Sequence, residues 1–356
     1  MSHLARAAAV LAFAGLVCAS PARAGDIKIG ISQPISGANG DYFKRELVNP
    51  AILAIEEANA KGGVLGHKIE YVVEDHKANA ATALAVARKL IDIDHVSMIS
   101  ISISPAVLAT LPVAEENNVV VMSAAQHPKI AESPWGFLST PAAPAFGIAQ
   151  ARFAYNDLKA RTAGVIGENN DAVRTTTTAF GKEFGALGGK LIDIETFNTN
   201  DSDFRAQLTK LRAANPDVLN MEPTAPHADG LILKQAAELN FRPPNIISSD
   251  FIIDPQAREI AGNLVSGVYY TVVDFDHDWN DKVFKPRFGY DADGFAARIY
   301  DGVGIYLAAV EKAGTSDPVK IRDTLRHLQG FHGVIGSWGY DGTGDPNMLP
   351  VMKRVP

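Results

Sequence analysis

Short apolar runs alternate with longer amphipathic stretches along most of the chain. The apolar runs have the length and β-branched composition of buried strands, and the longer stretches repeat apolar positions at helical spacing. The predicted strands are 27–31, 69–73, 96–101, 119–122, 162–166, 190–195, 218–221, 245–248 and 268–273. The predicted helices are 50–60, 80–93, 106–117, 145–159, 175–187, 203–213, 227–239, 295–313 and 318–328. This alternation predicts an α/β fold with parallel sheets that helices cover on both faces.

The alternation pauses twice, and the pauses divide the chain. One pause, 133–144, holds three prolines, and the other, 270–281, is acidic and aromatic. Four βα units precede the first pause and four more follow it. We therefore expect two doubly wound, Rossmann-like lobes joined by short crossovers, with the helices after Phe295 returning to the first lobe. In such folds a ligand binds at the carboxyl ends of the strands, here in the crevice between the lobes.

The N-terminus has the pattern of a cleavable export signal. An apolar run spans 4–17 with Arg6 as its only charge, and Ala22-Arg23-Ala24 supplies a small-x-small cleavage site. Because this run is too short to span a bilayer, we expect a signal peptide at 1–24 that is cut after Ala24. The rest of the chain has no second apolar run near 18 residues, so we expect no direct membrane insertion.

Composition limits the cellular compartments and the classes of partner that suit this chain. The formal charge of −7 becomes about −9 once Arg6 and Arg23 are removed, and this acidity argues against nucleic acid as a partner. The only cysteine, Cys18, lies within the signal, so the mature chain has no disulfide and no thiol ligand. Lipidation of Cys18 is disfavoured because Val17 stands where a small residue is normally required. Export without disulfides fits a bacterial periplasm.

Signatures of catalysis, nucleotide binding and metal binding are missing from the sequence. No Gly-x-Gly-x-x-Gly follows the first strand, and no P-loop, His-Glu-x-x-His or Gly-x-Ser-x-Gly occurs. The Asp-x-Asp-x-Asp segment at 274–278 resembles the start of a calcium loop. However, Trp279 and Lys285 occupy the positions that require glycine and glutamate. We therefore predict no enzyme activity, no cofactor and no metal site.

Short motifs in a fixed order over nearly the whole mature chain resemble one known family. They are 33–37 (QPISG), 58–69 (ANAKGGVLGHKI), 74–75 (ED), 112–116 (PVAEE), 204–208 (FRAQL), 300–303 (YDGV), 331–336 (FHGVIG) and 340–345 (YDGTGD). The chain is similar to the branched-chain amino-acid binding proteins, which are type I periplasmic solute-binding proteins of ABC importers. The resemblance implies two lobes, a hinge of three crossovers and closure on a small ligand. The expected division is 25–143 plus 274–343 for lobe 1 and 144–273 plus 344–356 for lobe 2.

The resemblance assigns residues to the carboxylate of the solute. A family serine after the third strand matches Ser104, with Ser102 as the alternative register. A hydroxyl and free N–H groups at a helix N-terminus bind an anion well, and Pro105 would suit position N1. A plain serine N-cap is the alternative. After the fourth strand, Ala124 matches a backbone carbonyl that binds the amino group, and Gln126 replaces a threonine that binds the carboxylate.

The resemblance places the acid that binds the solute ammonium at Asp250, one methylene shorter than the usual glutamate. The alternative role for Asp250 is an N-cap in the turn before Pro255. Thr224 stands where the family has a tyrosine, and a second family tyrosine is missing from 168–172. These departures enlarge or polarise one wall of the site.

Tyr42 and Phe295 match positions that pack on the solute side chain, and such an aromatic wall suits an apolar or aromatic solute. Ordinary packing is the alternative for both. Arg174 and Arg298 are nearby cations for which helix-surface roles are expected, with binding of a carboxylate as the alternative. His67, His76 and His95 are expected in surface loops, and His127 lies next to the candidate site.

These features together predict a periplasmic solute-binding component of an ABC importer. It would capture a small amino acid or related carboxylate between its lobes by hinge closure and dock, as a monomer, on a membrane permease. An aromatic acid or an amide-type compound is the alternative solute. A ligand-presenting sensor subunit is an alternative role, and a periplasmic hydrolase is a less favoured one.

Overall fold

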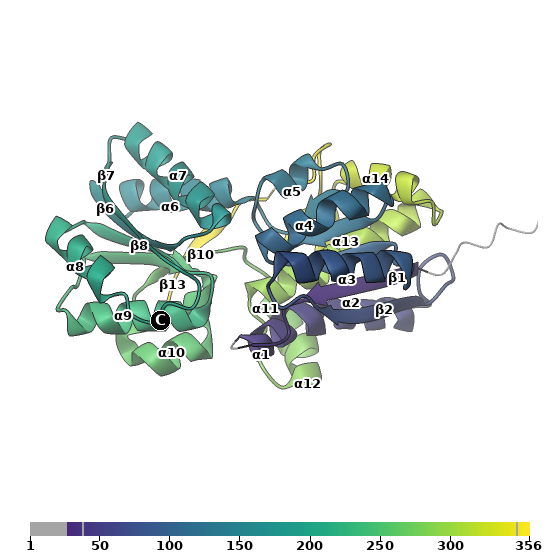
Figure 1. Cartoon of the computed structure of the whole chain (residues 1–356), viewed down its shortest axis with the longest axis horizontal. Helices are drawn as coiled ribbons and strands as arrows, with labels where there is room; N and C mark the ends of the chain where they lie inside the picture. The colour runs from purple at the N-terminus through teal and green to yellow at the C-terminus, as the bar shows by residue number, and fades with distance from the viewer. Residues whose placement is uncertain (1–26, 38, 347) are drawn as a thin grey trace, which may run out of the picture.

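Two lobes, each built around its own β-sheet, lie side by side along the length of the molecule (Figure 1). The computed structural model describes residues 27–37, 39–346 and 348–356, so the signal peptide predicted at 1–24 lies outside the described residues. None of the described helices has both the length and the apolarity needed to cross a bilayer.

The sheet of lobe 1 has five strands in the order β2-β1-β3-β4-β5, and every neighbouring pair is parallel. They are β1 (Ile27–Gln33), β2 (Ile69–Asp75), β3 (Met98–Ile101), β4 (Val120–Ser123) and β5 (Gly136–Leu138). A short antiparallel hairpin of β11 (Phe331–Gly333) and β12 (Gly336–Trp338) adjoins this lobe.

The sheet of lobe 2 has six strands in the order β13-β10-β9-β8-β6-β7, parallel except for the antiparallel edge strand β13. They are β6 (Thr162–Glu168), β7 (Lys190–Phe197), β8 (Val218–Glu222), β9 (Asn245–Ser249), β10 (Tyr269–Val272) and β13 (Val351–Arg354). Both sheets are therefore of the doubly wound type that the sequence predicts.

Helices cover both faces of each sheet. Those of lobe 1 are α1 (Gly40–Phe43), α2 (Asn49–Ala60), α3 (Ala80–Asp92), α4 (Ser104–Glu116), α5 (Lys129–Glu132), α11 (His277–Trp279), α12 (Lys285–Phe288), α13 (Gly294–Ala313) and α14 (Pro318–Arg326), with π-helical turns at Lys44–Val48 and Asn280–Phe284. Those of lobe 2 are α6 (Ala143–Asn156), α7 (Asp171–Ala186), α8 (Arg205–Ala214), α9 (Pro226–Glu238) and α10 (Pro255–Ala261), with 3₁₀ turns at Asp250–Ile253 and Gly262–Val265.

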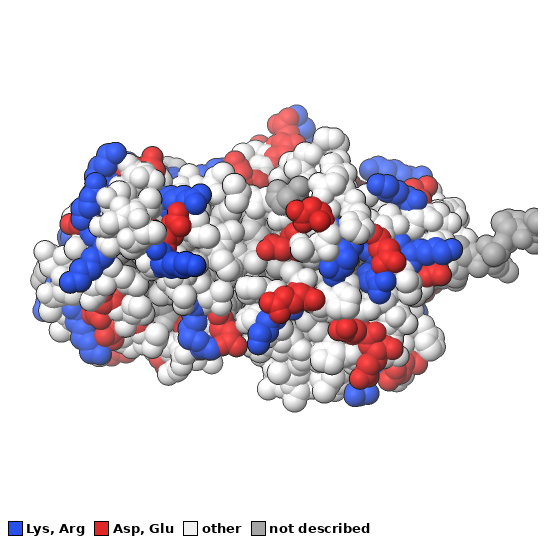
Figure 2. All heavy atoms as spheres, turned by 90° about the horizontal axis from the view of Figure 1, so that it is seen from above, with Lys and Arg blue, Asp and Glu red and all other residues white. Residues whose placement is uncertain are grey.

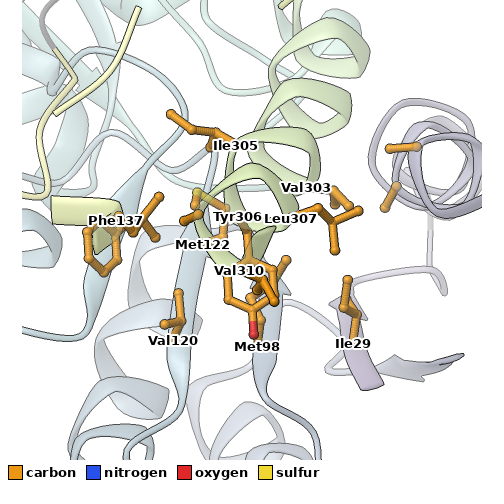
Figure 3. Close-up of a cluster of buried hydrophobic side chains, with 14 of the residues drawn as sticks. Ile29, Met98, Val120, Met122, Phe137, Val303, Ile305, Tyr306, Leu307 and Val310 are labelled. Carbon is orange, nitrogen blue, oxygen red and sulfur yellow. The ribbon is translucent and has the colours of Figure 1, made fainter. Parts of the chain in front are cut away.

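The long helix α13 forms the centre of the larger core of lobe 1. Its Tyr306 and Val310 pack over Met98, Val120 and other side chains of the first sheet, as Figure 3 shows. Helix α2 covers the same face, and α3 and α4 cover the opposite face. The packing explains why a segment so late in the sequence belongs to the first lobe: its apolar stripe is buried there.

The chain passes between the sheets three times, after β5, after β10 and before β13. The first and third crossovers are bonded to each other. The N–H of Leu138 donates to the carbonyl of Gly344 (2.7 Å), and the N–H of Ala142 donates to Oδ1 of Asp345 (3.2 Å). Hinges between domains consist of a few loop residues, and these crossovers are the loop segments that join the two lobes.

The predicted strands and the long helices are confirmed, with ends that shift by a few residues. The sequence pattern missed β5, the β11–β12 hairpin and β13, which have only three or four residues each. A strand of three or four residues is too short to produce a recognisable apolar run, and the prediction depends on such runs. In β5 the proline-rich surroundings also masked it.

Candidate functional site

The turn from β3 to α4 brings two candidate serines to the carboxyl end of the first sheet. Ser102 is 4% exposed, and its Oγ has no hydrogen-bond partner among the described residues. Ile103 then has φ 69° and ψ 105°, a left-handed backbone conformation that β-branched residues rarely adopt. Helix α4 begins at Ser104, so this serine lies at the positive end of the helix dipole.

The start of α4 corrects two predictions. Ile103, and not Ser104, holds the N-cap position, and no side chain caps the helix. Pro105 is accordingly the second helical residue and not N1. The serine N-cap alternative for Ser104 is therefore wrong. A strained residue such as Ile103 persists only where its surroundings impose it, and such residues concentrate at functional sites.

Two hydrogen bonds hold the turn after β4. The hydroxyl of Ser123 accepts from the N–H of Ala125 at 3.0 Å, and Ala124 is 1% exposed. The carbonyl of Gln126 accepts from the N–H of Ala143, the first residue of α6, at 2.6 Å. The Gln126 backbone is thus bonded to the start of the lobe 2 helix that follows the first crossover.

Asp250 lies at the carboxyl end of β9 and contacts a cation of the other lobe. Its Oδ2 accepts from Nη2 of Arg298 at 2.6 Å, and the two side chains are 6% and 0% exposed. The same guanidinium donates to Oγ1 of Thr140 at 3.2 Å and to the carbonyl of Gly294 at 2.7 Å. Arg298 also lies 3.9 Å from the ring centre of Phe295. A guanidinium therefore occupies the place next to Asp250 that the sequence assigned to a solute ammonium.

This arrangement corrects the helix-surface role predicted for Arg298, which is fully buried. Arg174, for which the same role was predicted, is exposed and pairs with Asp171 on α7. The N-cap alternative for Asp250 is also wrong, because Asp254 caps α10 through the N–H of Gln256. Burial raises the pKa of Asp250 to about 6 even though Arg298 lowers it.

Aromatic rings of both lobes meet at the same place. The hydroxyl of Tyr42 donates to Oδ2 of Asp293 at 2.6 Å, which fixes the ring. Phe251, from lobe 2, lies with its ring centre 6.0 Å from that of Tyr42 and stacks on Phe295 at 5.1 Å. Tyr42 and Phe295 therefore both pack against a phenylalanine of the chain itself, which is the packing role named as the alternative, and their role as a wall for the solute stays a prediction.

Carboxyl groups end three neighbouring strands of the second sheet. Glu168 at the end of β6 accepts from the hydroxyls of Thr199 and Thr224, Glu222 ends β8, and Asp250 follows β9. Glu222 accepts from Nδ2 of Asn220 at 3.0 Å, and burial raises its pKa to about 7. Thr224 thus points its hydroxyl at a carboxylate, and this edge of lobe 2 is rich in hydrogen-bond acceptors.

Two buried residues of lobe 1 were missed. His76 is fully buried, so the prediction of a surface loop for it is wrong, whereas His95 is exposed as expected. Gln33 is also fully buried at the end of β1. The signal that could have found both is their position, since polar residues directly after an apolar strand lie at the carboxyl edge of a parallel sheet.

The acidic turn at 274–278 uses its carboxylates locally. Asp276 caps α11 by accepting from the N–H of Asp278, while Asp274 pairs with Lys353 and Asp278 pairs with Lys282. Within the described ranges no group of three or more His, Cys, Asp or Glu side chains has an arrangement that could hold a metal ion.

A family model described as periplasmic binding protein matches residues 26–351 of this chain. The chain belongs to the periplasmic binding protein family. A Leu/Ile/Val-binding protein homolog of Brucella abortus is 27% identical over 355 residues, which is 96% of this chain and 91% of the relative. A leucine-, isoleucine-, valine-, threonine- and alanine-binding protein of Pseudomonas aeruginosa is also 27% identical, over 96% of this chain and 93% of its own.

Solved structures share the fold. A leucine-binding protein of Thermotoga maritima is 26% identical with a TM-score of 0.82, covering 92% of this chain and 95% of its own. An ABC-transporter solute-binding protein of Rhodopseudomonas palustris, in complex with 3,4-dihydroxybenzoic acid, has a TM-score of 0.83 at 22% identity. The latter covers 93% of each chain and bears on the fold alone.

In this periplasmic binding protein the candidate residues come from both lobes. Ser102, Ser104, Ala124 and Gln126 follow strands of the first sheet, and Thr224 and Asp250 follow strands of the second. Tyr42 lies on α1 and Phe295 on α13, and both face lobe 2 through Phe251. Acidic and basic side chains are interspersed over the visible face of both lobes (Figure 2).

Proposed function

We propose that this chain is the periplasmic solute-binding component of an ABC importer and that it captures a small carboxylate between its lobes. The observation that carries the proposal is the contact of the two lobes at the carboxyl end of β9, where Asp250 pairs with Arg298, in a molecule whose chain crosses between the lobes three times. In such a molecule a solute that contacts both lobes stabilises the closed form, because those contacts are absent when the lobes separate.

The carboxylate of the solute binds at the start of α4. Ser104 supplies a hydroxyl and an N–H at the positive end of a helix of 13 residues. Ala124 and Gln126, in the turn after the neighbouring strand β4, supply a backbone carbonyl and a side-chain amide. An amino acid or a related small carboxylate fits this set, in keeping with the amino acids named for the similar proteins.

An aromatic acid is the second candidate solute, and one specific observation favours it. Asp250, the acid expected to bind an ammonium, is paired with Arg298, while Tyr42, Phe251 and Phe295 form an aromatic cluster near it. A site whose acid is already neutralised has less to offer an α-ammonium group, whereas ring faces still favour an aromatic solute.

The remaining parts of the proposal follow from the family. The signal peptide is cut after Ala24, and the mature protein acts as a monomer that delivers its solute to a membrane permease. The lobes divide at 25–143 plus 274–343 and at 144–273 plus 344–356. The protein makes and breaks no bond in its solute, so a bound solute is released chemically unchanged.

The test is calorimetric titration of purified mature protein, after partial unfolding and refolding to remove carried-over solute. The panel contains leucine, phenylalanine, benzoate and 4-hydroxybenzoate. We expect at least one compound to bind with one-to-one stoichiometry, and we expect Ser104→Ala to weaken it about tenfold or more. Ser266→Ala, which changes an exposed serine before β10, is the matched control. Equal affinity of Ser104→Ala and wild type for a carboxylate would refute the anion site.

Binding of phenylalanine or leucine with a clear loss in Asp250→Asn would favour the amino-acid solute and an ammonium role for Asp250. Binding of benzoates that Asp250→Asn leaves intact would favour the aromatic acid. Mass spectrometry of the compound recovered from the complex checks that it is unchanged, and conversion of the compound would support the hydrolase alternative.

A further inference from the structure

Three buried side chains at the carboxyl edge of the first sheet carry polar atoms without hydrogen-bond partners. Gln33 and His76 are 0% exposed and Ser102 is 4% exposed. Within the part of the chain that the structure describes, no group satisfies Oε1 of Gln33, either ring nitrogen of His76 or Oγ of Ser102 with hydrogen-bond geometry. Since buried polar groups in native proteins are nearly always satisfied, three unsatisfied neighbours need an explanation.

The three side chains lie at the ends of neighbouring strands. They end or follow β1, β2 and β3, which are adjacent in the sheet order. The N–H of His76 donates to the carbonyl of Gln33 at 3.3 Å, and Nε2 of Gln33 points at the carbonyl of Ser100 at 3.4 Å. The backbone of Ser102 approaches the His76 ring and raises its pKa as a weak hydrogen-bond partner does, although the contact falls short of full hydrogen-bond geometry.

Strand alternation shows which way two of them face. Ile29 and Ile31 of β1 and Met98 of β3 pack in the core under α13. Because successive side chains alternate between faces, Gln33 and Ser102 lie on that same face of the sheet. This is also the face covered by the helix that carries Phe295, and Ser104 follows two residues after Ser102.

The three groups are uncharged, and together they offer both hydrogen-bond donors and acceptors. Burial lowers the pKa of His76 to about 4, so the ring is uncharged at neutral pH and offers one donor and one acceptor. Ser102 offers a hydroxyl that can do either, and Gln33 offers an acceptor oxygen because its amide N–H donates to Ser100. A hydroxyl or a primary amide matches this set, whereas an ion finds no counter-charge in it.

We propose that Gln33, His76 and Ser102 form a neutral polar subsite that binds a hydroxyl or amide substituent of the solute. The subsite lies beside the carboxylate position at Ser104. This inference rests on the proposed function, and it narrows the solute from any small carboxylate to one that bears an uncharged polar substituent.

The test compares pairs of compounds that differ by one substituent. The pairs are 4-hydroxybenzoate and benzoate, tyrosine and phenylalanine, 2-hydroxyisocaproate and isocaproate, and 4-carbamoylbenzoate and 4-methylbenzoate. Calorimetric titration of the mature protein should give about tenfold tighter binding of the substituted member in the pair that fits. Ser102→Ala and His76→Leu should each remove that preference, and His76→Leu should do so while the unsubstituted member binds as before.

Thr110→Val is the matched control, since Thr110 is also fully buried with an unpartnered hydroxyl but lies in the middle of α4. Thr110→Val should leave the affinity for both members of each pair unchanged. A second readout is the melting temperature without solute: removing an unsatisfied polar atom should leave it unchanged or raise it. If His76→Leu does not fold, Ser102→Ala, which removes a single oxygen, decides the question.

A uniform loss of affinity for both members of a pair, or a lowered melting temperature without solute, would show a purely structural role and overturn the inference. Carboxylates that bind without any preference for the substituted member would also overturn it and leave the proposed function standing. If wild type binds none of these compounds nor the panel above, the proposed function itself fails.

Discussion

The buried pair of Asp250 and Arg298 is the residue-scale feature that most changes the view of the site. An isolated buried charge is far more costly than a paired one, so removing either partner should be strongly destabilising. Asp250→Ala should lower the free energy of unfolding by about 3–5 kcal/mol, and adding Arg298→Met should recover much of the loss. Urea unfolding measures both, with exposed Arg174→Met as a control that stays within about 0.5 kcal/mol. An Asp250→Ala protein as stable as wild type would mean that the pair does not persist in solution.

Glu222 gives a pH-dependent prediction at the same scale. Burial raises its pKa from 4.5 to about 7. The folded state therefore holds the proton more tightly than the unfolded state. Its contribution to stability is fully present below about pH 4.5 and is lost as the pH rises through about 7. Glu222→Gln should remove this loss, so the variant should be more stable than wild type at pH 8 by up to about 3 kcal/mol and similar to it at pH 4.5. Parallel stability curves of the two proteins from pH 4.5 to 8 would contradict the assignment.

Single residues show how much of the site could be predicted from the sequence. The family resemblance, and not the hydrophobic pattern, assigned Ser102, Ser104 and Asp250 to the site, and the structure places all three just after the carboxyl ends of strands. The partner of Asp250 could not be found this way, since Arg298 is 48 residues further on and comes from the other lobe. The apolar residues of helix α13 predict that the helix packs in a core. They do not predict that Arg298 on the same helix is buried as well.

At the scale of elements, one carboxylate holds the β11–β12 hairpin on lobe 1. Asp301 on α13 accepts from the N–H groups of Val334 and Ile335 at 2.8 and 2.9 Å and from Nε1 of Trp338 at 3.2 Å. Asp301→Ala should leave these donors without partners and lower stability by about 2–4 kcal/mol, with faster hydrogen exchange at 331–338. Asp323→Ala on α14, an exposed acid, is the control. Unchanged exchange in the hairpin would show that its packing and not Asp301 holds it.

The strands also show which elements a hydrophobic pattern can predict and which it cannot. Strands such as β1 and β6 have seven residues each, of which all but one are buried, so their apolar content and length identify them. Strand β13 has four residues, with two of them exposed, and exists because β10 offers it an edge. A segment whose structure depends on a distant partner does not carry that structure in its own pattern.

At the scale of the whole molecule, several contacts join the lobes directly. Arg298 and Asp250 pair across them, Phe251 stacks on Phe295, and Arg45 lies 3.3 Å from Asp254. Separation of the lobes must break these contacts, so they set part of the balance between open and closed forms. We expect Phe251→Ala to shift this balance toward the open form and to enlarge the radius of gyration measured by small-angle X-ray scattering. The same radius in the variant and wild type would show that Phe251 does not hold the lobes together.

Capture of a small carboxylate by closure of the lobes is the central claim. The most direct measurement is the radius of gyration of solute-free mature protein, by small-angle scattering, before and after saturation with the tightest-binding compound of the calorimetric panel. We expect a contraction in wild type that Ser104→Ala fails to show at the same compound concentration, while Ser266→Ala contracts like wild type. An unchanged radius at saturation, or equal contraction in Ser104→Ala with equal affinity, would contradict it.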